Sequence, residues 1–208
     1  MYKKQMTVQK VVCLLAIAAS VIVFIYSLGL MTDIFDNLKF PVTDARINDA
    51  RKNLYPDMKP GTDFIGIGIY DRMDAFNKDL LLVAIGLILL ALLLFITNTA
   101  SRRKYYIGNY IAVALNVICN VAAAIWAHTW IAGFKAQYLA MDHAAVAWIY
   151  QNKLYKEYTQ STFWFDAHYF VFALALIVSA LLIVNVIWKI CLMKEEKRLI
   201  AEGKEQSV

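Results

Sequence analysis

The residues best suited to chemistry in this sequence are two histidines, His128 and His168, each at one end of a long apolar stretch. Imidazole nitrogens bind transition metals, and histidines on facing helices of a bundle can hold a haem. Both rings are expected at a similar depth, so they could meet if their helices are neighbours. Asp166 could then act as a third ligand or orient a ring. Alternatively, each histidine is an interfacial residue that binds nothing, and the lack of a tight motif favours this interpretation, with no cofactor and no metal.

The third histidine, His143, is expected to stand apart from this pair. It lies 15 residues beyond His128 in the sequence, which corresponds to about 22 Å along a continuous helix. Its neighbour Asp142 is not expected to work with it as an acid–base pair, because adjacent side chains on a helix point in different directions. The sequence therefore predicts no catalytic residues.

Three asparagines form a polar stripe on one of the apolar stretches. Asn109, Asn116 and Asn120 follow one another at spacings of seven and four residues, so they share a helix face. Amides in hydrocarbon need hydrogen-bond partners, so this face should point into the protein. Bonds between helices, worth about 0.5–2 kcal/mol each, are the favoured interpretation. A path or pocket for a small solute or lipid is the alternative.

Long apolar stretches must position all of these side chains. Hydrophobic residues make up 61 % of the 208 residues, against roughly half in soluble domains. A helix needs about 20 apolar residues to cross the ~30 Å of hydrocarbon in a bilayer. The sequence predicts an all-α membrane protein, a four-transmembrane-helix bundle that forms a single integral membrane domain. The expected spans are residues 11–32, 80–97, 105–130 and 167–188.

Two longer polar segments, 33–79 and 135–166, separate these spans. Residues 44–53 are charged and predict a short surface helix, whereas residues 64–70 predict an extended stretch. Asn77 or Asp79 is expected to cap the second span at its start. Apolar residues recur at helical spacing beyond residue 135, which predicts that the third helix continues past the membrane. We expect an outward-facing cap formed by the first long loop and this extended third helix.

The distribution of charge predicts the orientation in the membrane. The short segments 1–10, 98–104 and 189–208 together carry 11 basic and 4 acidic residues, whereas the two long segments carry 10 basic and 12 acidic residues. Because cytoplasmic flanks of spans are enriched in Lys and Arg, both termini are expected to be cytoplasmic. The expected location is the plasma (inner) membrane. The basic residues flank apolar stretches and form no basic face, so nucleic acid is not an expected partner.

The spans contain no charged residue at mid-depth, which argues against an ion pump or a proton-coupled transporter. The favoured function is that of a non-catalytic accessory or scaffolding subunit of a membrane complex. Its expected partners are the lipid bilayer and another membrane or extracytoplasmic protein. Two alternatives remain open: a metal- or haem-binding membrane redox protein that uses His128 and His168, and a small-solute or lipid transport component.

Overall fold

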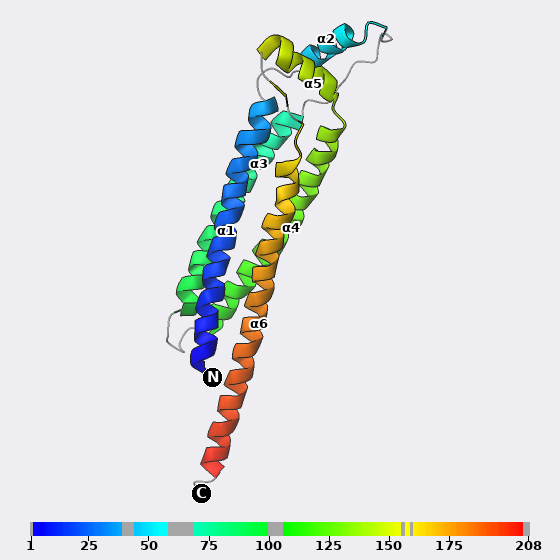
Figure 1. The fold of residues 1–208 in the computed structure, drawn as a ribbon. Coiled ribbons are helices and arrows are strands. Elements are labelled where there is room, and N and C mark those ends of the chain that lie inside the picture. Colours follow the sequence, from blue (N-terminus) through cyan, green and yellow to red (C-terminus); the bar gives the residue numbers. More distant parts are fainter. Residues whose placement is uncertain are drawn as a thin grey trace. The chain divides into compact units, whose positions relative to one another are not determined.

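The computed structural model describes residues 2–38, 44–57, 69–99, 106–154, 157–158 and 160–205. Every regular element within these ranges is a helix (Figure 1). In chain order, the elements are α1 (Tyr2–Leu38), α2 (Asp44–Leu54), α3 (Ile69–Thr99), α4 (Tyr106–Leu139), α5 (His143–Ile149), the π-helix η2 (Tyr150–Leu154) and α6 (Phe163–Glu205). The predicted all-helical class is therefore confirmed for the described part of the chain.

Four of the described helices, α1, α3, α4 and α6, are long and apolar enough to cross a membrane. Each contains one of the four predicted spans, except that α4 begins one residue later than its predicted span. Large apolar side chains are exposed along these helices, for example Leu82 at 67 %, Ile118 at 63 % and Phe170 at 71 %. Exposed large apolar side chains in such number suit a lipid environment better than water.

The chain divides into two compact units. The first unit comprises residues 1–23, 83–125 and 171–208, and the second comprises residues 24–82 and 126–170. Small residues are prominent in the core of the first unit, which lets helix backbones approach closely. This core contains Val12, Cys13, Ala16, Ala19, Ala91, Leu94, Ala112, Val113, Val178 and Leu182.

In the second unit, the short helices α2 and α5 pack against each other. Ile47 of α2 is fully buried and Ile149 of α5 is 1 % exposed, so their apolar faces are covered. Arg51 Nε lies 3.1 Å from Asp142 Oδ2, which adds an ion pair beside the apolar contact. Asp142 also caps α5, because its side chain accepts a hydrogen bond from the backbone N–H of Ala145. The predicted surface helix over residues 44–53 is confirmed as α2.

Helix α3 corrects two of the sequence-based predictions. It begins at Ile69, so Asn77 and Asp79 lie inside the helix and neither caps its start. The charged turns before residue 80 are helical because Met73, Phe76 and Leu80 place an apolar side chain inward on successive turns, and all three are buried. Of the predicted extended stretch, residues 69–70 are helical and residues 64–68 lie outside the described part.

Helix α4 continues past residue 130, as predicted for the third apolar helix, but it ends at Leu139. A separate helix, α5, then begins at His143. A new helix starts here because the Asp142 side chain caps α5. Apolar periodicity alone predicts that α4 continues through this point. Residues 100–104 of the basic link lie outside the described part, as does the C-terminal end from residue 206.

Candidate functional site

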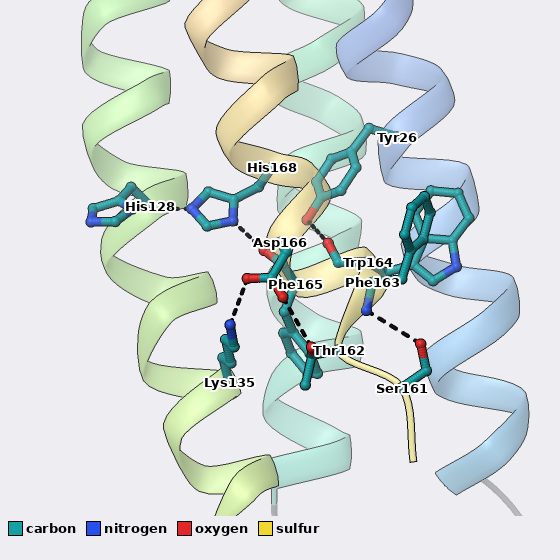
Figure 2. A network of polar contacts seen from close by, with 10 residues as sticks. All are labelled: Tyr26, His128, Lys135, Ser161, Thr162, Phe163, Trp164, Phe165, Asp166 and His168. Carbon is teal, nitrogen blue, oxygen red and sulfur yellow. Dashed lines mark hydrogen bonds and ion pairs between the residues drawn. The ribbon is translucent and has the colours of Figure 1, made fainter. Parts of the chain in front are cut away.

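His128 on α4 and His168 on α6 lie within hydrogen-bonding distance in the second unit (Figure 2). His128 Nδ1 is 3.0 Å from His168 Nε2. The ring centroids are 5.3 Å apart and the planes differ by 28°. His168 is 2 % exposed, whereas His128 lies on an exposed face. The structure therefore brings together the two histidines that the sequence singles out.

The hydrogen bonds of His168 determine the direction of the contact. Its Nδ1 also contacts the backbone oxygen of Phe165 (Figure 2). Because a carbonyl oxygen only accepts, this Nδ1 carries the hydrogen, and Nε2 of the neutral ring is left as an acceptor. His128 Nδ1 must then donate to His168. The result is an ordered chain from His128 through His168 to the Phe165 carbonyl, which leaves Nε2 of a neutral His128 unprotonated.

The carboxylate of Asp166 bonds to partners other than those expected of a third metal ligand beside the two histidines. Its Oδ1 lies 2.5 Å from Lys135 Nζ, and its Oδ2 accepts a hydrogen bond of 2.9 Å from the Thr162 hydroxyl (Figure 2). Asp166 lies in the first turn of α6, where a negative charge is favourable near the helix N-terminus. The carboxylate therefore joins α4 to the start of α6 through Lys135.

The geometry limits how the histidine pair could hold a metal. Metal–imidazole bonds are about 2.0–2.1 Å long, so ligands on opposite sides of an iron lie about 4 Å apart. The facing nitrogens of His128 and His168 are 3.0 Å apart. Binding through both would require loss of the hydrogen between them and, for a haem, separation of the rings. Among the described residues, no group of three or more His, Cys, Asp or Glu could hold a metal ion.

His143 takes part in a separate polar cluster with Tyr138 and Tyr158. Its Nε2 lies 2.9 Å from the Tyr138 carbonyl oxygen, so Nε2 donates and Nδ1 accepts. The Tyr158 hydroxyl, 2.8 Å from Nδ1, is therefore the donor. Burial raises the pKa of Tyr158, which keeps this phenol protonated. Asp142 faces Arg51 instead, so Asp142 and His143 have different partners.

A close contact between α1 and α6 was not predicted from the sequence. The Tyr26 hydroxyl donates a hydrogen bond of 2.8 Å to the Trp164 carbonyl oxygen (Figure 2). One turn further along α1, a Cβ added to Gly29 would lie 2.4 Å from the Trp164 ring. A glycine within an apolar helix is a recognised signal for close helix packing, and this signal could have identified Gly29.

The asparagine stripe lies in the first unit, and Asn109, Asn116 and Asn120 are all buried. Asn120 Nδ2 donates to the backbone oxygen and to Oδ1 of Asn116, at 2.9 Å in each case. Both bonds stay within α4. Asn116 Nδ2 has no hydrogen-bond partner among the described residues.

A second amide cluster in the first unit does connect different helices. Gln5 Nε2 donates to Gln9 Oε1 at 2.9 Å and to Asn185 Oδ1 at 3.2 Å. Gln9 Nε2 in turn donates to the backbone oxygen of Asn98 and lies 3.3 Å from its Oδ1. These bonds join α1 to α3 and α6. The two buried glutamines lie in the segment 1–10, for which only a basic flank was predicted. Their spacing of four residues, which places them on one helix face, is the signal that could have identified them.

The polar side chains described here thus contact one another within their own units. No protein-family model, no curated protein and no solved structure matches this chain.

Proposed function

We propose that this chain is a non-catalytic accessory or scaffolding subunit of a membrane complex. The observation that carries this proposal is that the side chains able to act as acids, bases or ligands bond to other residues of the chain. His168 bonds to a backbone carbonyl and to His128, and Asp166 bonds to Lys135 and Thr162. A catalytic acid or base must reach a substrate, whereas these groups hold helices to one another. Such use is typical of a protein whose role is to present a surface.

The packed pair of α2 and α5 is the surface that we propose for a protein partner. Its apolar side chains are buried between the two helices, for example Ile47 and Ile149. Arg51 and Asp142 form an ion pair at its margin, each with 20 % of its side chain exposed. A folded surface with exposed polar groups is well suited to bind the extramembrane part of a neighbouring protein.

This proposal places the chain in the plasma (inner) membrane as a multi-pass protein. The α2–α5 pair would form the outward-facing cap, and both termini would be cytoplasmic. The support is the excess of basic residues in the short segments, where Lys and Arg mark the cytoplasmic side. In this orientation, the cap would meet an extracytoplasmic protein or the outer part of another membrane protein.

Site-specific photo-crosslinking in intact cells tests the proposal. A photo-reactive residue in place of Lys52, which is exposed on α2, should give a discrete crosslinked product of higher mass. The matched control is the same residue in place of Leu82, which is 67 % exposed on the apolar face of α3 and should contact only lipid. If position 52 gives no such product and the protein purifies from mild detergent as a lone monomer, the proposal fails.

A metal- or haem-binding redox role is the second candidate, and the observation that favours it is that the exposed His128 lies beside a second imidazole, that of His168. The unprotonated Nε2 of a neutral His128 would be the first ligand available. A visible absorption spectrum and metal analysis of the purified protein test this role. A colourless, metal-free preparation would eliminate it, whereas a haem band lost in His128→Ala would displace the scaffolding proposal.

A further inference from the structure

A pocket of about 230 Å³ lies between α3 and α4 in the second unit. Its lining residues on α3 follow one another at spacings of three, one and three, so they share one helix face, and its two tryptophans on α4 are four residues apart. The pocket is lined by Arg72, Ala75, Phe76, Asp79, Trp126 and Trp130. It is smaller than the sites of about 300–1,000 Å³ that hold drug-sized ligands, so its ligand should have the size of a headgroup.

Three aromatic rings line this pocket together. The Phe76 ring centroid lies 4.9 Å from that of Trp126 and 6.2 Å from that of Trp130. Phe76 is 5 % exposed, whereas Trp130 is 47 % exposed, so the rings extend from the core of the unit to its surface. Aromatic rings attract organic cations through the negative potential of their faces, and tryptophan does so most strongly.

Two residues of opposite charge, Arg72 and Asp79, line the pocket. Arg72 donates a hydrogen bond of 2.5 Å to Gln137 Oε1, and Gln137 does not line the pocket. The carboxylate of Asp79 forms no hydrogen bond or ion pair with any residue in the described part of the chain. One carboxylate is thus available beside three aromatic rings. A small inorganic cation would require several oxygen ligands, and this pocket offers a single carboxylate.

We propose that this pocket binds an organic ammonium cation of the quaternary, methylated type. The positive charge lies beside the Asp79 carboxylate, and the methyl groups pack against Phe76, Trp126 and Trp130. A free solute of the choline type and the choline headgroup of a lipid share this chemistry. The proposal does not depend on the scaffolding function, because it concerns a small ligand of α3 and α4 and not the α2–α5 pair.

Binding is tested with the full-length protein in maltoside detergent, which contains no ammonium group. The probes are choline chloride and tetramethylammonium chloride, and the readout is saturation-transfer NMR of their N-methyl protons. Both probes should bind saturably, and sodium chloride at the same ionic strength should not displace them. Asp79→Asn and Trp130→Leu should each weaken binding by about tenfold or more, as loss of a desolvated cation–π or charge contact predicts.

The matched control is Asp74→Asn, which removes an acidic group from the same helix. Asp74 Oδ2 pairs with Lys78 Nζ at 2.6 Å, and neither residue lines the pocket. This variant should bind both probes as the wild type does. Size-exclusion chromatography reports whether each variant is folded, and Trp130→Leu keeps the test decisive if Asp79→Asn does not fold. Absence of saturable binding, or equal binding by Trp130→Leu and the wild type, overturns the proposal.

Nanodiscs distinguish the two sources of the cation. If the ligand is a lipid headgroup, choline should bind in discs of phosphatidylglycerol and be excluded in discs of phosphatidylcholine. If the ligand is a free solute, choline should bind equally in both kinds of disc. Failure of choline to bind in either kind of disc contradicts the proposal for both sources.

Discussion

Gly29 of α1 lies directly against the indole ring of Trp164 on α6. A Cβ added at Gly29 would lie 2.4 Å from Trp164 Cη2 and 2.5 Å from Cζ3. Real side chains do not approach so closely, so any residue larger than glycine must displace the ring. Tyr26 lies one turn away and donates a hydrogen bond to the Trp164 carbonyl oxygen. These two contacts fix the packing of α1 against the first turn of α6 within the second unit.

Gly29→Ala should therefore destabilise the protein by about 1–3 kcal/mol, the usual cost of overpacking a well-packed contact. The measurement is thermal or denaturant unfolding of the purified protein in detergent. Gly86→Ala is the matched control, because nothing lies within 4 Å of a Cβ added at Gly86, and it should be neutral or stabilising since Ala is the better helix former. Equal losses for the two variants would contradict the contact between Gly29 and Trp164.

The histidine pair predicts an order of stability among three variants. His168→Ala removes a buried ring and two hydrogen bonds, so it should cost about 1–3 kcal/mol. His128→Ala removes an exposed ring and one hydrogen bond, so it should cost less. Because the two rings are in contact, the double variant should differ from the sum of the single variants by about 0.5 kcal/mol or more. Unfolding of all four proteins completes this double-mutant cycle, and strict additivity would argue against a direct hydrogen bond.

The four helices that are long and apolar enough to cross a membrane could be predicted because the property that defines them is local. A stretch of about 20 apolar residues meets the requirement of the bilayer wherever it lies in the chain. The start of α3 could not be predicted in this way, because residues 69–79 are charged on one side and apolar on the other. Their inward face, with Met73 and Phe76, becomes visible only once they are known to be helical.

The candidate site could be predicted only in part, for a different reason. Counting residues along α4 and α6 gives His128 and His168 a similar depth, but it does not give the rotation of either helix about its axis. That rotation decides that the two rings meet at 3.0 Å. It also decides that Asp166 faces Lys135, which lies 31 residues away in the sequence. Local periodicity does not specify this rotation. The sequence therefore suggests Asp166 as a ligand and cannot show that it faces Lys135.

The amide cluster of the first unit predicts that Gln9 contributes more to stability than Asn120. Gln9→Leu removes the hydrogen bonds that join α1 to Asn98 of α3, so it should cost about 0.5–2 kcal/mol. Asn120→Leu is the matched control, because its hydrogen bonds to Asn116 stay within α4, and it should cost less. Unfolding in detergent gives the free energy of unfolding of both variants. A larger loss of stability for Asn120→Leu than for Gln9→Leu would contradict the prediction that the bonds between helices contribute more.

The proposed orientation predicts which thiols a membrane-impermeant maleimide reaches in intact cells. Asn53→Cys places a thiol on the exposed face of α2, so it should be labelled from outside if the α2–α5 pair faces outward. The native Cys191 is exposed near the C-terminal end of α6 and serves as the internal control. In the proposed orientation it should be labelled only after the membrane is permeabilised, because basic residues around a span end mark the cytoplasmic side. Labelling of Cys191 in intact wild-type cells would invert the orientation, and the α2–α5 pair would then have to find its partner in the cytoplasm.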